Sequence, residues 1–118
     1  MRPQSEQHLL RALALDPAYY SAHYLLAVAR KNLDDRPAAA AHYARFLAEA
    51  PRDARKRPNA LYGLAGCELA AEPSAADWGR LRRALGRAAA CERELEPLWG
   101  PCEAPEKELL GALLAARP

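Results

Sequence analysis

The sequence predicts an all-α protein, and three observations support that prediction. Alanine and leucine supply most of the apolar residues, which make up 51% of the chain. Residues with a β-branched side chain are nearly absent, because Val28 is the one valine and neither isoleucine nor threonine occurs. Prolines stand between segments whose apolar residues recur at helical spacing. Strands are built largely from the missing residue types, whereas alanine, leucine, arginine and glutamate favour helices, so we expect about six helices and no sheet.

Three helices are expected in the first half of the chain. The first covers about residues 4–15, where four leucines form its apolar set. Asp16 is expected to cap the second helix and Pro17 to lie in its first turn, where the missing N–H costs nothing. This second helix reaches about Leu33 and is apolar nearly all round, so it is expected to lie between neighbours. The third covers about residues 37–49 and starts at a proline.

Three further helices are expected in the second half. One covers about residues 58–72, where leucines and an alanine form one stripe. Ser74 and Asp77 have the spacing of a capping box at the start of a longer helix of about twenty residues. Prolines and a glycine mark an irregular stretch from 96 to 105. The last helix covers about residues 105–116, and its first residues are acidic, which suits the positive end of the helix dipole.

A repeat is the second feature of the sequence. Pro17 and Pro51 end two successive blocks and stand 34 residues apart. Between them, small residues are expected where two antiparallel helices cross, and large ones fill the flanks. The residues that fit this pattern are Leu26, Ala27, Ala39 and Tyr43. With this period and these residues the chain resembles the tetratricopeptide repeat family. The alternative is an unrelated helical bundle with coincidental prolines.

The resemblance implies a short α-solenoid of antiparallel helix pairs with a C-terminal capping helix, all in one domain of residues 1–118. The implied parts are a half repeat over 4–17, a full repeat over 18–51, a divergent repeat over 58–95 and the capping helix over 105–116. The first helix lacks a pairing helix in this register. It is therefore expected to cap the stack, to continue a longer array, or to associate with a second copy of the chain.

The resemblance also implies a site, because the first helix of each pair lines the concave surface on which partners lie. The implied partner-binding residues are Ser21, Tyr24, Val28, Lys31, Asn59, Tyr62 and Gly66. Tyr24 and Tyr62 would be amphipathic anchors of a kind enriched at interaction hot spots. The alternative is that both tyrosines are half-buried packing residues.

Basic residues form two groups in the sequence. One lies in the connector over residues 51–57, and the other recurs at helical spacing in the long fifth helix. The residues of this basic patch are Arg55, Lys56, Arg57, Arg80, Arg83 and Arg87. An acidic protein segment or RNA could bind there. No aromatic residue is interleaved for base stacking and glutamates follow directly, so a solvated helix face is the simpler interpretation and nucleic acid is not expected.

No constellation of catalytic residues is recognisable. The glycines are dispersed, the serines lack a nucleophile's turn context, and no paired carboxylates fall on an expected inward face, so we expect neither an enzyme nor a small-molecule substrate. No cofactor or metal is expected, although His23 and His42 could lie near each other if their helices pack antiparallel. The three cysteines show no paired spacing and are expected to be reduced thiols.

Composition also bears on partners and location. The net charge of +2 is too small to imply nucleic acid, and no apolar run is long enough to enter a membrane or to form a secretory signal. A cytoplasmic adaptor or scaffold that binds a peptide or helix of another protein is the resulting hypothesis. A regulatory or targeting appendage of a larger enzyme or complex is the alternative, and RNA binding is the weakest of the three.

Overall fold

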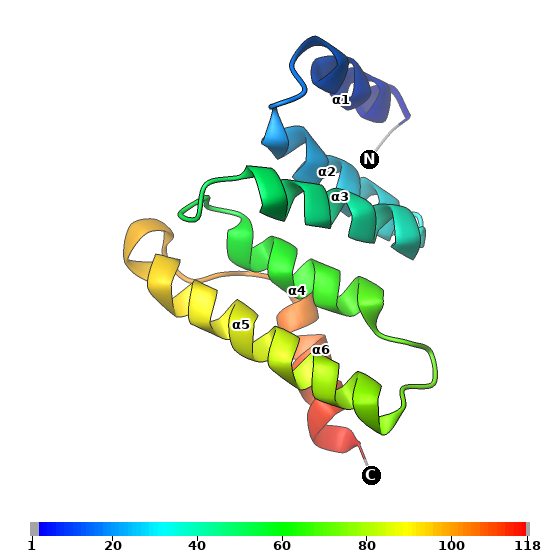
Figure 1. Cartoon of the computed structure of the whole chain (residues 1–118), viewed down its shortest axis with the longest axis vertical. Coiled ribbons are helices and arrows are strands. Elements are labelled where there is room, and N and C mark those ends of the chain that lie inside the picture. The colour runs from blue at the N-terminus through cyan, green and yellow to red at the C-terminus, as the bar shows by residue number, and fades with distance from the viewer. Residues whose placement is uncertain (1–2, 118) are drawn as a thin grey trace.

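Six helices and no strand form within residues 3–117, the part of the chain that the computed structural model describes; side chains are described from Glu6 onward. The helices are α1 (Pro3–Leu15), α2 (Tyr20–Asn32), α3 (Arg36–Glu49), α4 (Arg57–Glu68), α5 (Ala75–Trp99) and α6 (Pro105–Ala116). Helices adjacent in sequence pack side by side from α1 to α5, and α6 lies behind α4 and α5 (Figure 1). The all-α class and the helix number are confirmed.

Two helix starts follow the sequence prediction closely. The Asp35 carboxylate accepts the N–H of Ala38 at 3.3 Å, and a proline occupies the first turn of α3. At the start of α5, the Ser74 hydroxyl accepts the N–H of Asp77 at 3.2 Å, while the Asp77 carboxylate accepts the N–H of Ser74 at 2.9 Å. This reciprocal pair is the predicted capping box, and it satisfies two backbone donors that a helix start would otherwise leave open.

Replacement of Ser74 by alanine is expected to lower the free energy of unfolding by about 1 kcal/mol, because the N–H of Asp77 loses its acceptor. Ser74→Asn is the matched control, since its side chain also accepts from the backbone, and it should stay within a few tenths of a kcal/mol of wild type. Urea denaturation followed by circular dichroism measures both. Equal stability of the alanine and asparagine variants would contradict the role of the cap.

The prediction for the start of α2 was wrong. The Asp16 carboxylate accepts the N–H of Ala18 at 3.1 Å, and the Asp16 carbonyl accepts the N–H of Tyr19 at 3.0 Å. Asp16 and Pro17 therefore build a separate turn, and α2 begins three residues after the proline, at Tyr20.

Two helix ends also differ from the prediction. α4 stops at Glu68 rather than near 72, because the backbone of Leu69 is extended. The Arg36 guanidinium donates to the carbonyls of Gly66 and Leu69 and so satisfies this helix end. α5 continues through Pro97 to Trp99, whereas an irregular stretch was expected from 96. The indole N–H of Trp99 donates to the carbonyl of Asp53 at 2.8 Å, which ties this last turn to the connector before α4.

The largest buried cluster joins α2, α3 and α4. Ala27 and Ala39 are fully buried, and these small side chains let α2 and α3 approach closely. Tyr43 and Phe46 fill the flanks, and the Tyr43 ring lies against Gly63 of α4. This arrangement agrees with the small and large residues that the sequence pairs in α2 and α3.

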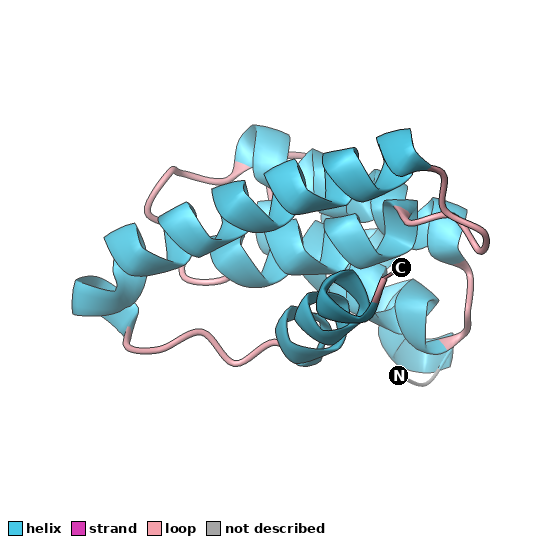
Figure 2. Cartoon of the chain, turned by 90° about the horizontal axis from the view of Figure 1, so that it is seen from below, coloured by secondary structure: helices cyan, strands magenta, loops and turns pink. Residues whose placement is uncertain are grey.

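Two smaller clusters attach α5 and α6. One joins Tyr62, Ala88 and Ala104, and the other contains Leu110 of α6, which packs with Ala65 and Leu81 of α4 and α5. Figure 2 shows α6, beside the C label, on one side of the longer helices. The C-terminal helix thus has the predicted bounds, and it packs against both α4 and α5.

Candidate partner-binding site

The predicted binding residues follow one side of α2 and one side of α4, which we call the α2–α4 face. On α2, positions 21, 24, 28 and 31 are spaced three or four residues apart, so they lie along one side of the helix, and all four are half-buried. On α4, positions 59, 62 and 66 have the same spacing. The face is defined by Ser21, Tyr24, Val28, Lys31, Asn59, Tyr62 and Gly66.

A single segment, residues 102–110, lies along much of this face. The Asn59 side-chain amide donates to the carbonyl of Glu103 at 3.0 Å, and the ammonium of Lys31 donates to the carboxylate of Glu106. A Cβ atom added at Gly66 would lie 3.5 Å from Cγ of Glu106 and 3.8 Å from Cδ1 of Leu110, so both side chains lie next to this glycine. The segment therefore runs beside α4 from Asn59 to Gly66 and reaches across to α2.

Tyr62 lies beneath this segment. Its side chain is 3% exposed and packs with Ala88 and Ala104, and its hydroxyl donates to Glu92 at 3.0 Å. Burial, reinforced by the bond to Glu92, raises the pKa of the Tyr62 phenol. In this conformation Tyr62 is a packing residue, as the alternative interpretation of the sequence had it, and its ring offers no free surface to a partner.

Glu92 secures the other side of the segment. Its second carboxylate oxygen accepts from the Lys107 ammonium at 2.6 Å. Burial opposes ionisation of Glu92, but the hydrogen bonds from Lys107 and Tyr62 outweigh it and lower the pKa of the carboxyl. Residues 102–110 are thus fixed by charged contacts on both sides, to α2 through Lys31 and to α5 through Glu92.

Tyr24 stays half-buried at the edge of the face. Its ring meets Tyr43 edge-on at 6.1 Å and lies 5.5 Å from Phe46. The Lys56 ammonium stands 5.9 Å from the centre of the Tyr24 ring, within the range of a cation–π contact. Burial, together with the charge of Glu106, raises the pKa of the Tyr24 phenol, so the hydroxyl stays neutral.

The remaining residues of the face have different surroundings. Ser21 lines a cavity of about 310 Å³ with Phe46, the connector before α4 and Trp99. Val28 is half-buried.

The sequence did not indicate that residues 102–110 would lie on this face. The signal that could have suggested it is Glu106 followed four residues later by Leu110, which share one side of α6.

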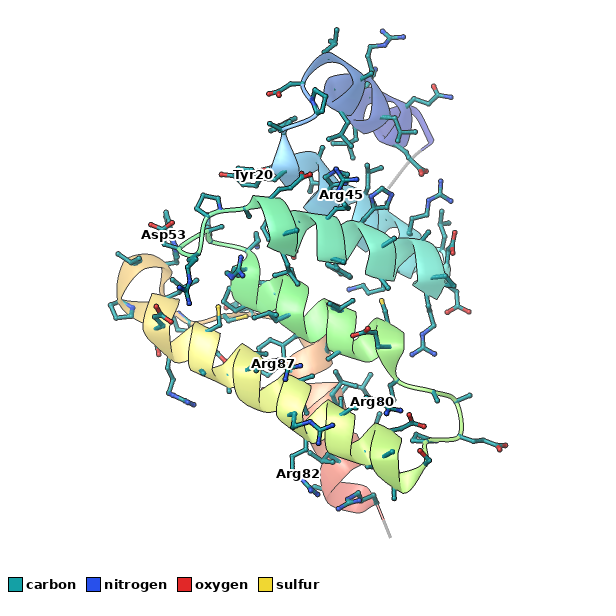
Figure 3. All side chains as sticks on the ribbon, in the orientation of Figure 1. Tyr20, Arg45, Asp53, Arg80, Arg82 and Arg87 are labelled. Carbon is teal, nitrogen blue, oxygen red and sulfur yellow. The ribbon has the colours of Figure 1, made fainter. Side chains whose placement is uncertain are left out.

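The basic residues divide between separate places. Arg80, Arg83 and Arg87 line a cavity of about 360 Å³ between α4 and α5, whose lining also includes Glu68, Asp77 and apolar side chains. The Arg80 guanidinium pairs with Asp77. Figure 3 shows Arg80 and Arg87 on the side of α5 toward α4, and Arg82 on the opposite side. Two connector residues, Arg55 and Lys56, line another cavity of about 290 Å³.

Arg57 has a structural contact of its own. Its guanidinium donates to the carbonyl of Leu47 at 3.2 Å, near the C-terminal end of α3. These two cavities share no lining residue. The arginines of α5 and the basic residues of the connector therefore do not line a single cavity.

The expected proximity of His23 and His42 is confirmed. Their Nδ1 atoms lie 3.1 Å apart, and the Glu49 carboxylate stands 3.9 Å from Nε2 of His23. At that distance one ring donates and the other accepts, so at least one of them is neutral. Within the described residues, no group of three or more His, Cys, Asp or Glu side chains is arranged to hold a metal ion.

Acidification from about pH 7.5 to 5.5 is expected to lower the melting temperature. Burial lowers the pKa of both rings; Arg45 adds to this effect at each of them, whereas Glu49 opposes it at His23. At His42, His23 and Arg30 also lower the pKa, and Glu6 raises it. Because the folded-state pKa lies below the unfolded value of about 6.5, the unfolded chain gains protons first, so the stabilisation is complete above that pH and is lost below it.

Scanning calorimetry at both pH values measures this effect. In His42→Gln the decrease in melting temperature should shrink by about half, since one of two titrating rings is gone. His8→Gln changes an exposed histidine of α1 and should keep the wild-type decrease. A wild-type melting temperature that is equal at both pH values would refute the role of the pair.

Neither a scan against protein-family models nor searches of the curated proteins and the solved structures found a match to this chain. The tetratricopeptide resemblance therefore stays a prediction from the residues. Among the described helices, none combines the length and the apolar character that a membrane crossing needs.

Proposed function

We propose that the chain is a protein-interaction module of the tetratricopeptide type, a scaffold or adaptor that binds a peptide or helix of a partner on the α2–α4 face. The 34-residue period and the close approach of α2 and α3 at Ala27 and Ala39 support the solenoid arrangement. Micromolar affinity, about −8 kcal/mol, is expected for a face of this modest size.

The proposal rests on the packing of residues 102–110 against the α2–α4 face. One continuous segment, part extended and part helical, contacts Lys31 of α2 and Asn59, Tyr62 and Gly66 of α4. The face therefore has the shape, the hydrogen-bond donors and the charge to hold a polypeptide segment. A segment supplied by another protein would find the same donors.

Peptide selection followed by mapping tests the proposal. A library of displayed peptides is selected on the immobilised chain, and each selected peptide is titrated into the ¹⁵N-labelled chain while amide resonances are recorded. The expected result is a saturable shift of amides in α2 and α4, around Tyr24, Val28 and Asn59. Shifts confined to the surroundings of Arg80, Arg83 and Arg87 would assign binding to the cavity between α4 and α5 and contradict the proposal.

If the chain is instead a regulatory or targeting appendage, the same face binds a segment within a larger protein or complex. The full-length reading frame distinguishes this function from that of an adaptor. Self-association through α1 also stays a prediction. α1 packs against α2 and exposes Leu10 and Leu15, and light scattering over a concentration series tests whether a dimer forms. RNA binding is the weakest hypothesis, because the basic residues divide between separate cavities.

A further inference from the structure

The contacts of residues 102–110 describe the chemistry that the α2–α4 face selects. Glu103 and Ala104 precede the helix, and Ala104 has an extended backbone that presents the Glu103 carbonyl to Asn59. Pro105 then opens α6, and the Glu106 carboxylate in the first turn meets Lys31. Leu110, four residues later on the same side of the helix, enters the cluster beside Gly66.

α6 is held through one side of the helix. Leu110 is 3% exposed, whereas Leu109 is 60% and Leu113 41% exposed. Half-buried Leu114 also packs against the cluster of Leu110, so α6 docks through Leu110 and Leu114 and leaves Leu109 and Leu113 exposed. Gly100, whose φ of 81° is a backbone angle that other residues rarely adopt, and Pro101 turn the chain between α5 and this segment.

We propose that residues 102–110 are an intrachain ligand of the α2–α4 face, and that the partner is a protein segment of the same chemistry which displaces them. That segment has a few extended residues, then a helix with a carboxylate in its first turn and a leucine four positions later. This inference rests on the proposed function, because it names the partner class of that same face. Binding is then competitive: the partner replaces the contacts of α6 with Lys31, Asn59 and Gly66.

The first test uses a labelled peptide with the sequence of residues 101–117 and three full-length chains: wild type, Leu110→Ala and Leu109→Ala. Fluorescence anisotropy measures peptide binding, and circular dichroism confirms the helix content of each chain. In the wild-type chain the tethered copy competes at an effective concentration on the order of millimolar, so the free peptide binds weakly. Leu110→Ala weakens the tethered copy and should raise the affinity for the peptide about tenfold or more. Leu109→Ala, at an exposed neighbouring position, should behave as wild type.

A reversible lock keeps the inference testable if Leu110→Ala fails to fold. Cysteines at positions 66 and 106 (Gly66→Cys with Glu106→Cys) lie close enough to cross-link, because a Cβ at 66 would stand 3.5 Å from Cγ of Glu106. The natural cysteines are replaced by alanine in this variant. The oxidised chain should reject the 101–117 peptide, and the reduced chain should bind it.

Equal binding of the peptide to the oxidised and reduced lock, or to all three unlocked chains, would overturn the inference. These experiments distinguish failure of the inference from failure of the proposed function. If the 101–117 peptide never binds while library-selected peptides of other chemistry still shift α2 and α4 amides, the face is a binding site and the intrachain-ligand inference alone fails.

Discussion

Replacement of Leu26 by alanine is expected to destabilise the chain by about 3–5 kcal/mol, the upper part of the range for a buried leucine. The Leu26 side chain is 0% exposed and is among the largest that are fully buried in the described residues. The truncation loses the free energy gained by moving these apolar atoms out of water. It also leaves a cavity beside α2, which packs against α1 and α3. A loss of this size is a large part of the stability of an ordinary domain, about 5–15 kcal/mol, so partial unfolding at room temperature is expected.

Leu25→Ala is the matched control for this prediction. Leu25 is the preceding residue of the same helix and is 42% exposed, so its replacement should change the free energy of unfolding by about 0.5 kcal/mol or less. Urea denaturation of both variants gives the comparison. Similar losses for the two leucines would mean that α2 is not buried on the side where Leu26 lies.

Gly63→Ala is expected to destabilise the chain although alanine is the better helix former. A Cβ at position 63 would stand 2.5 Å from Cζ of Tyr43 and 2.7 Å from its hydroxyl oxygen. Tyr43 is 1% exposed, so its ring has no free space into which to move. Overpacking of this kind costs about 1–3 kcal/mol, which exceeds the gain of up to about 1 kcal/mol from helix propensity.

Gly86→Ala is expected to change the stability in the opposite direction. Gly86 also lies inside a helix, but nothing stands within 4 Å of the position that its Cβ would take. The substitution should therefore stabilise the chain by about 0.5–1 kcal/mol. Thermal unfolding of the two variants under identical conditions measures the contrast. A Gly63→Ala variant as stable as Gly86→Ala would show that α3 and α4 are not in close contact at Tyr43.

The helices were predictable because local signals coincide with them. Pro37 and Pro105 stand in first turns, and the capping pair of Ser74 and Asp77 marks a start. The ends that were missed depend on side chains distant in sequence. Arg36 binds the last carbonyls of α4, and Trp99 binds a carbonyl of the connector, and neither contact leaves a trace in local composition.

The α2–α4 face was predictable as a set of positions, since spacing along α2 and α4 determines which residues share a side. What covers the face was not. α6 carries Leu109, Leu110, Leu113 and Leu114, and such a stripe does not reveal which neighbouring helix it will meet. The burial of Tyr62 follows from the place of Ala104 above it, a contact between residues 42 positions apart.

The most direct test of the account is a charge exchange across the contact between Lys31 and Glu106. The chain carrying Leu110→Ala and Glu106→Gln, whose tethered segment has no charge to pair with Lys31, is titrated with and without Lys31→Glu. The titrant is the 101–117 peptide, with and without Glu106→Lys. Each single reversal is expected to weaken binding about fivefold, which corresponds to about 1 kcal/mol for a partly buried ion pair, and the double reversal should recover most of that loss. Recovery would place the peptide on the α2–α4 face in the register of the intrachain segment. If the two reversals weaken binding independently and the losses add, the peptide does not contact Lys31 through Glu106, and the assignment of this face is wrong.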